Sequence, residues 1–251
     1  MNMFFALYWK ELRGARNTFL TLLALIFGLD VFLATRIGSA GYWSAFGFSF
    51  LPLVFLFFWG IFRPLALTRG EWKEGTAPFL WSLPVNGWQI LGAKLLAAFT
   101  EWIGLNLATF VLSGLFYAAA PLCGAEWVAL SELPRLNESI EFLAIVALNT
   151  AMGILLGSII CQLAYLLGRL VNRFAGLVSF GATLFLIYLT SKGSELLVPL
   201  FPGLNNIRNP FLTSDMGAFQ SVSMAVFLVM LIEFVLLFLV TGWVMEKKME
   251  F

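Results

Sequence analysis

Six apolar segments, each close to the length that crosses a lipid bilayer, dominate this sequence. A transmembrane helix needs about 20 mostly apolar residues to cross about 30 Å of hydrocarbon. The chain is 61% hydrophobic and only 12% charged, whereas soluble domains carry about 25% charged residues. We therefore predict an all-α integral membrane protein. Its six transmembrane helices are expected at Asn17–Thr35, Trp43–Phe62, Leu95–Ala119, Ile140–Gly168, Phe174–Leu189 and Ser221–Val244.

The distribution of basic residues predicts the orientation of these spans. Cytoplasmic loops of membrane proteins are enriched in Lys and Arg. If the N-terminus is cytoplasmic, eleven of the 15 basic residues fall on that side. The remaining basic residues, on the other side, are Arg36, Arg135, Lys192 and Arg208. With an even number of spans, both termini are then cytoplasmic.

Residues 1–16 predict a helix that lies in the membrane interface, because their apolar side chains recur on one face at helical spacing. That face consists of Phe4, Leu7, Tyr8 and Leu12. The alternative is a simple cytoplasmic extension of the first span. Near the other end, residues 195–202 (ELLVPLFP) are apolar but too short to cross, which favours a re-entrant or surface segment between spans five and six.

We predict one membrane domain over residues 1–251. Its parts are an interfacial helix at 1–16, spans at 17–62, a cytoplasmic region at 63–94, spans at 95–189, an extracytoplasmic segment at 190–220, and the last span with a cytoplasmic tail at 221–251.

The cytoplasmic region contains a polar, proline-marked stretch that predicts a short transverse helix. Thr76 is a candidate N-cap, and Pro78 lies in the first turn, where its missing N–H costs nothing. Pro84 ends the helix. Such a helix exposes bulky apolar side chains that either dip into the headgroup layer or fill a groove in a partner. The alternative is a re-entrant or purely interfacial loop.

Four short motifs, in this order and spacing, resemble the ABC-2 family of ATP-binding-cassette (ABC) transporter permeases. They are Trp9-Lys10-Glu11-Leu12-Arg13, Glu71-x-x-Glu74-Gly75-Thr76, Ser82-Leu83-Pro84-Val85 and Gly92-Ala93-Lys94. Six spans and cytoplasmic termini also resemble that family. The sequence departs from it at Ala77-Pro78, where family members more often place Leu and an acidic residue.

The resemblance implies a membrane permease subunit, an exporter in the inner (plasma) membrane, that works with two separate ABC ATPase subunits and a second permease. That second permease is either another copy of this chain or a related one. The short helix would be a coupling helix that docks on an ATPase. The implied docking residues are Glu71, Lys73, Glu74, Thr76, Phe79, Leu80 and Trp81.

The chain itself is not expected to be an enzyme or to hold a cofactor. It lacks the G-x-x-x-x-G-K-[ST] motif, whose backbone N–H groups and Lys hold phosphates. ATP and magnesium are therefore expected in the partner ATPase. The absence of His removes the commonest metal ligand, and Cys123 and Cys161 form no metal-binding pattern. No basic-aromatic stripe indicates nucleic acid; membrane lipid is the other expected partner.

Three acidic residues lie within the predicted spans and are candidates for the translocation path. A charge in hydrocarbon is costly, so Asp30, Glu101 and Glu233 should each face protein or water. Asp30 lies six residues from Arg36, and Glu101 lies seven residues after Lys94, so paired structural roles are equally compatible. For Glu233 the alternatives are the path and an interhelical hydrogen bond.

Gly153 and Gly157 form a GxxxG pattern in the fourth span. Small residues let helices approach closely, which predicts packing within the chain or, alternatively, a subunit interface.

An ion-gradient-driven secondary transporter is the alternative function. Such proteins place polar residues near the middle of discontinuous spans. Here that region offers little beyond Glu233, Asn106, Asn149 and Gln162. The spans are compatible with lipid, peptide, drug or polysaccharide cargo.

Overall fold

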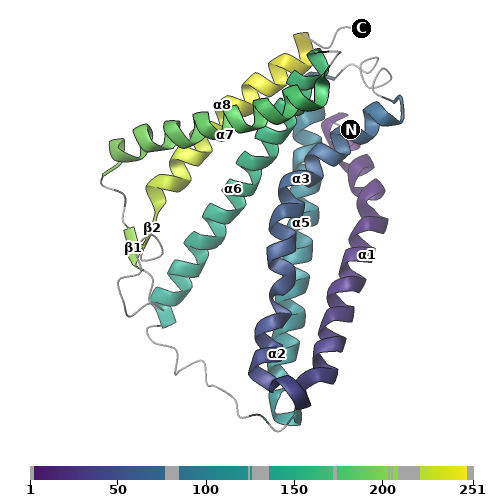
Figure 1. Cartoon of the computed structure of the whole chain (residues 1–251), viewed down its shortest axis with the longest axis vertical. Helices are drawn as coiled ribbons and strands as arrows, with labels where there is room; N and C mark the ends of the chain where they lie inside the picture. The colour runs from purple at the N-terminus through teal and green to yellow at the C-terminus, as the bar shows by residue number, and fades with distance from the viewer. Residues whose placement is uncertain are drawn as a thin grey trace. The chain divides into compact units, whose positions relative to one another are not determined.

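A computed structural model describes residues 3–76, 85–123, 125, 136–171, 174–202, 204, 206–208 and 221–247 (Figure 1). The α-helices are α1 (Met3–Ala40), α2 (Tyr42–Ser49), α3 (Leu51–Lys73), α5 (Gly87–Ala118), α6 (Leu136–Leu170), α7 (Ala175–Leu197) and α8 (Met224–Lys247). Short 3₁₀ helices are η1 (Ala120–Cys123) and η3 (Val198–Leu200). Strands β1 (Asn206–Arg208) and β2 (Ser221–Ser223) pair antiparallel, with Ile207 opposite Val222.

Among the described residues, six helical segments are long and apolar enough to cross a membrane. They are Met3–Gly38, Tyr42–Lys73, Gly87–Ala118, Ile140–Leu170, Ala175–Leu200 and Met224–Lys247. The prediction of a multi-pass, six-helix membrane protein is confirmed at this level.

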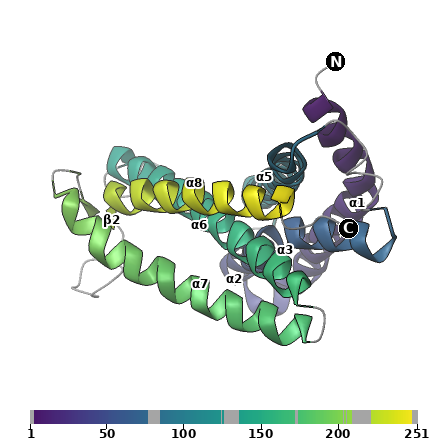
Figure 2. The ribbon, with the colours of Figure 1, turned by 90° about the horizontal axis from the view of Figure 1, so that it is seen from above.

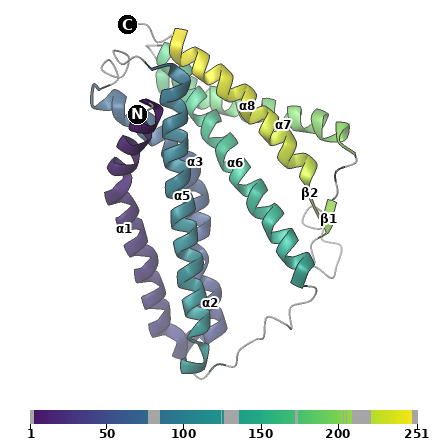
Figure 3. The ribbon, with the colours of Figure 1, turned by 180° about the vertical axis from the view of Figure 1, so that it is seen from behind.

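The chain divides into two compact units, Met1–Val128 and Ala129–Phe251, where the sequence predicted a single membrane domain. In the first unit, α5 packs against both α1 and α3, as Figure 3 shows. In the second unit, α6 packs against both α7 and α8, which Figure 2 shows from above. Each unit contains three of the candidate spans.

Helix α1 runs without interruption from Met3 to Ala40. The predicted N-terminal helix and first span are therefore one continuous helix, and the position of the first part in the interface stays a prediction. The 20 residues from Arg16 to Arg36 rise about 30 Å at 1.5 Å per residue, which equals the thickness of the hydrocarbon core. The stretch of α1 between these two arginines is therefore long enough to cross the hydrocarbon core.

The predicted second span consists of two helices that meet at Phe50. Pro52 lies in the first turn of α3, where a missing N–H is tolerated. Helix α3 then continues past Phe62 to Lys73, so the first part of the predicted cytoplasmic region is helical.

The predicted fifth span ended too early. Helix α7 continues past Leu189 to Leu197, and η3 follows directly. The apolar residues 195–200 therefore extend this span, and the prediction that they form a separate re-entrant or surface segment is wrong. Lys192 and Glu195 form an ion pair at 2.6 Å, one turn apart, which is compatible with a continuing helix. Residues 209–220 of the predicted extracytoplasmic segment lie outside the described residues.

The core of the first unit is a small apolar cluster between α1, α3 and α5. It is built on Ile26, Leu56 and Leu105, all nearly inaccessible to solvent. Many other large apolar side chains of these helices are exposed, which is the surface that a lipid-facing helix requires because hydrocarbon replaces water around it.

Candidate functional site: a charged cluster at one end of three helices

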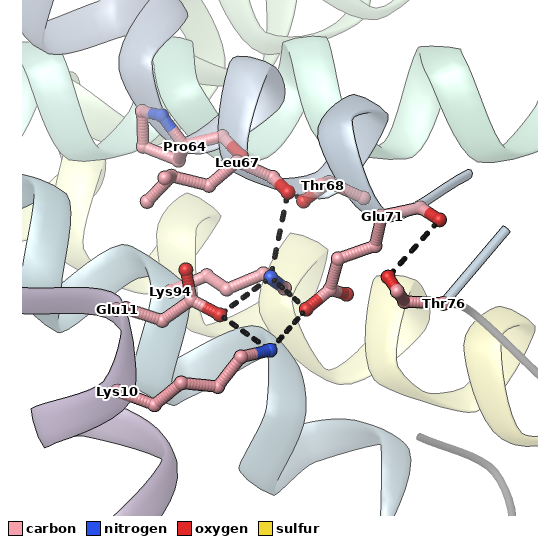
Figure 4. A network of polar contacts seen from close by, with 8 residues as sticks. All are labelled: Lys10, Glu11, Pro64, Leu67, Thr68, Glu71, Thr76 and Lys94. Atoms are coloured by element: carbon pink, nitrogen blue, oxygen red, sulfur yellow. Dashed lines mark hydrogen bonds and ion pairs between the residues drawn. The ribbon is translucent and has the colours of Figure 1, made fainter. Parts of the chain in front are cut away.

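Two lysines and two glutamates from three helices form a charged cluster in the first unit (Figure 4). Lys94 Nζ of α5 lies 2.9 Å from Glu11 Oε1 of α1 and 2.8 Å from Glu71 Oε1 of α3. Lys10 Nζ of α1 lies 3.1 Å from the same Glu71 oxygen and 3.7 Å from Glu11 Oε1. The cluster Lys10–Glu11–Glu71–Lys94 has no net charge.

Lys94 is the buried centre of this cluster. Its side chain is 2% exposed, and its ammonium also donates to the backbone carbonyl of Leu67 at 3.4 Å. Burying an ammonium is very costly unless the charge is paired and hydrogen-bonded. Three acceptors from α1 and α3 meet this requirement, so Lys94 joins three helices that are separated in the sequence.

Helix α3 ends directly beside the cluster in a Schellman motif. The N–H of Thr76 donates to the carbonyl of Glu71 at 3.0 Å, the Glu74 N–H donates to the Gly70 carbonyl, and Gly75 has a φ of 69°. This pattern satisfies the last carbonyls of a helix, and glycine supplies the left-handed residue that it requires. The Thr76 hydroxyl donates to the same Glu71 carbonyl at 3.3 Å. In the described residues Thr76 thus closes α3; the helix that it was predicted to begin lies outside them.

The start of α5 is also fixed locally. The Asn86 N–H donates to Gln89 Oε1 at 3.2 Å, one half of a capping box. The chain therefore leaves α3 and enters α5 through two defined helix ends. The cluster ties both helices together a few residues away from those ends.

A second buried ion pair lies further along the same helices. Arg63 Nε of α3 donates to Glu101 Oε2 of α5 at 2.7 Å, and the guanidinium lies 5.3 Å from the centre of the Trp59 ring. Glu101 Oε1 has no hydrogen-bond partner in the described part of the chain. The sequence spacing suggested Lys94 as the partner of Glu101; the structure pairs Glu101 with Arg63.

The predicted docking residues separate into two groups. The Glu71 side chain, 12% exposed, is engaged within the charged cluster. Lys73, Glu74 and Thr76 are exposed at the end of α3. The other predicted docking residues, Phe79, Leu80 and Trp81, lie outside the described residues, as does the rest of the predicted coupling helix at 77–84.

The two other intramembrane acids are buried in different settings. Glu233 Oε1 of α8 accepts a hydrogen bond from Ser194 Oγ of α7 at 3.0 Å, which is the interhelical bond expected as one alternative. Both carboxylate oxygens of Asp30 lack a hydrogen-bond partner among the described residues, so the anticipated hydrogen-bonded pair with Arg36 is not formed. Arg36 lies over the ring of Phe32 instead, 5.4 Å from its centre.

Among the described residues, no close packing is found at Gly153, because a Cβ added there would meet nothing within 4 Å; packing within the chain at Gly157 stays a prediction. The crowded glycines are elsewhere. A Cβ at Gly168 would collide with Ser179, and one at Gly193 would lie 2.9 Å from Glu233 Oε1. A subunit interface at Gly153 and Gly157 stays a prediction.

Sequence reasoning missed the cluster around Lys94, although all four of its members had been named as parts of motifs. Each charge lies near the end of an apolar run, which is where solvated lysines and glutamates are ordinary. The signal that could have suggested this cluster is the equal number of positive and negative charges among Lys10, Glu11, Glu71 and Lys94.

Comparison with known proteins identifies no relative: no family model matches the chain, and no curated protein or solved structure matches it significantly. Within the described ranges, no group of three or more Cys, Asp or Glu side chains could hold a metal ion.

Proposed function

We propose that this chain is the membrane permease subunit of an ABC-2-type ABC transporter, an exporter in the inner (plasma) membrane that is driven by separate ATPase subunits. The observation that carries the proposal is the charged cluster. It ties α1, α3 and α5 together next to the segment that resembles a coupling helix. The resemblance of the sequence motifs supplies the family.

The cluster is suited to transmitting a force. A partner that pushes on the end of α3 displaces Glu71, and Glu71 is held by Lys94, which is held by Glu11. These contacts are short and largely shielded from water, where ion pairs are stronger than at a surface. Movement at the segment between Thr76 and Val85 is therefore passed to three helices together instead of being absorbed by a flexible loop.

Energy must come from a partner on this proposal, because the sequence has no phosphate-binding loop. ATP and magnesium belong to two ATPase subunits, and a second permease completes the assembly as a further copy or a related chain. The proposed orientation, with both termini cytoplasmic, follows from the distribution of Lys and Arg.

The proposed docking surface has an exposed polar part and an apolar part. Lys73, Glu74 and Thr76 are the exposed polar residues, and the resemblance adds Phe79, Leu80 and Trp81. We assign Glu71 a positioning role instead of a direct contact, because its carboxylate is already engaged by Lys94 and Lys10.

Purification of the tagged chain in a mild detergent, with identification of co-eluting chains, tests this function. We expect an ATPase with a phosphate-binding loop in an equal number of copies. Glu74→Lys should weaken its retention at least about tenfold, since reversing this exposed charge places like charges together at the proposed interface. Glu195→Lys is the matched control: Glu195 is also exposed and near a helix end, but in α7.

The proposal is wrong if no such ATPase co-elutes, or if Glu74→Lys and Glu195→Lys retain it equally. Transport by the purified chain alone, driven by a proton or sodium gradient, would establish the secondary-transporter alternative.

A further inference from the structure

A pocket of about 330 Å³ lies between α1 and α5, beside the Arg63–Glu101 ion pair. Its lining residues are Leu12, Ala15, Arg16, Phe19, Thr100, Glu101 and Gly104. Its volume is within the range of small-molecule sites. Most of the lining is apolar, with three polar side chains.

Two polar side chains of this pocket carry opposite charges, Glu101 and Arg16, and they need ligand groups of opposite sign. Glu101 is 2% exposed at its side chain, and its Oε1 has no hydrogen-bond partner among the described residues. Its other oxygen is held by Arg63. Arg16 is exposed, and no ion pair of it is found in the described part of the chain. Buried polar atoms normally have a partner, so the pocket offers an anion site at Arg16 and, if the Glu101 carboxylate turns, an acceptor for an N–H donor.

An apolar hollow lies further along the same two helices. A second pocket of about 470 Å³ is lined by Leu20, Leu23, Ala24, Phe27, Ala108, Val111 and Leu112. The 11 residues from Arg16 to Phe27 rise about 16 Å, close to the roughly 15 Å of one leaflet, half of the hydrocarbon core. The α1–α5 groove, made of these two pockets, therefore has a polar end at the bilayer boundary and an apolar length that matches one acyl chain.

We propose that the α1–α5 groove binds a zwitterionic aminophospholipid of the phosphatidylethanolamine class. The lipid phosphate pairs with Arg16, its primary ammonium donates to Glu101, and one acyl chain lies along the apolar part of the groove. Oε1 is buried, so the carboxylate turns toward the pocket when the ammonium arrives; this last torsion of Glu is soft, and the turn also shifts Oε2 relative to Arg63. The inference does not depend on whether the chain is an ABC permease.

Two other phospholipid classes fit the groove less well. Phosphatidylglycerol supplies a phosphate for Arg16 but no cation for Glu101, and it leaves the carboxylate oxygen without a charged donor. Phosphatidylcholine has a quaternary ammonium without N–H, so it cannot donate a hydrogen bond to Oε1. A charge-assisted hydrogen bond is about twice as strong as a neutral one, which is the basis of the expected preference.

Native mass spectrometry of the purified chain, titrated with dioleoyl forms of these three phospholipids, tests the proposal. We expect one saturable site that prefers phosphatidylethanolamine about tenfold over both others. Arg16→Gln should abolish saturable binding. Arg13→Gln is the matched control, because Arg13 is an exposed arginine one turn away that does not line the pocket.

Two further variants separate the headgroup from the groove. Glu101→Gln should leave phosphatidylethanolamine with no preference over phosphatidylcholine. Gly104→Leu should block the site, since even a Cβ there would lie 3.0 Å from the Phe19 ring. Because Glu101→Gln also alters the pair with Arg63, the melting temperature of each variant is measured alongside.

The proposal is overturned if phosphatidylglycerol binds more tightly than phosphatidylethanolamine, or if no lipid saturates. It is equally overturned if Arg13→Gln and Arg16→Gln weaken binding alike, since that result indicates general attraction to the basic end of α1.

Discussion

Replacing Lys94 with Met removes the centre of the charged cluster while keeping most of the side chain's length. The change leaves Glu11 and Glu71 facing the position of a lost cation, with only Lys10 to neutralise both. Lys10 is 54% exposed, so water screens its interactions and it compensates weakly. We expect the first unit to lose stability.

The size of the effect follows from how deeply the cluster is buried. Removing one partner of a buried ion pair costs about 3–5 kcal/mol, because a charge is left uncompensated. Glu11 and Glu71 are 11% and 12% exposed, so some water reaches both carboxylates, and we expect the lower end, about 3 kcal/mol. For a chain of this size that corresponds to a fall in melting temperature of about 6–12 °C.

Thermal unfolding in detergent, followed by intrinsic tryptophan fluorescence, measures this shift. Lys192→Met is the control, because it breaks an exposed pair with Glu195 that is worth about 0–1 kcal/mol. In the double variant Lys94→Met/Glu71→Gln, Lys10 and Glu11 balance again, and we expect about half of the loss to be recovered. The reasoning is refuted if Lys94→Met shifts the melting temperature no more than Lys192→Met does.

Two further predictions concern the second unit and use the same melting assay. Gly168→Ala should destabilise by about 1–3 kcal/mol, the usual cost of overpacking, because the new Cβ collides with Ser179. Gly153→Ala should be neutral or stabilising by up to about 1 kcal/mol, since its Cβ meets nothing and Ala favours a helix; equal losses at both glycines would contradict this. Glu233→Gln should change stability by less than about 1 kcal/mol, because an amide oxygen still accepts the Ser194 hydrogen bond. Glu233→Leu should cost more, because it leaves the Ser194 hydroxyl without this acceptor. Similar losses of stability in the two variants would contradict the role of this hydrogen bond.

The number and type of the helices were predictable because hydrocarbon imposes a strict length on an apolar helix. The ends of those helices were less predictable. Residues 195–202 were predicted to form a separate segment, yet α7 continues to Leu197 and η3 follows to Leu200. Polar residues and glycine around Lys192 resemble a break in the sequence, but α7 continues through them, with Lys192 paired to Glu195 one turn further on.

Residues of the candidate site could be named from the sequence, but the contacts between them could not. Motif resemblance singled out Glu71 and Lys94, and both lie in the charged cluster. Spacing along a single helix suggested Lys94 as the partner of Glu101. The structure pairs each with a residue from another helix, because neighbours across an interface depend on how helices rotate about their axes.

The sequence by itself determined that this chain forms six apolar helices, since the length and composition of an apolar run are properties of the chain's order. Only the tertiary structure decided that Lys94 is buried among glutamates of two other helices, that Glu101 pairs with Arg63, and that the α1–α5 groove has a polar end. These are properties of three helices packed together, and a contact between residues 83 positions apart, such as Lys94 with Glu11, has no signature along the chain.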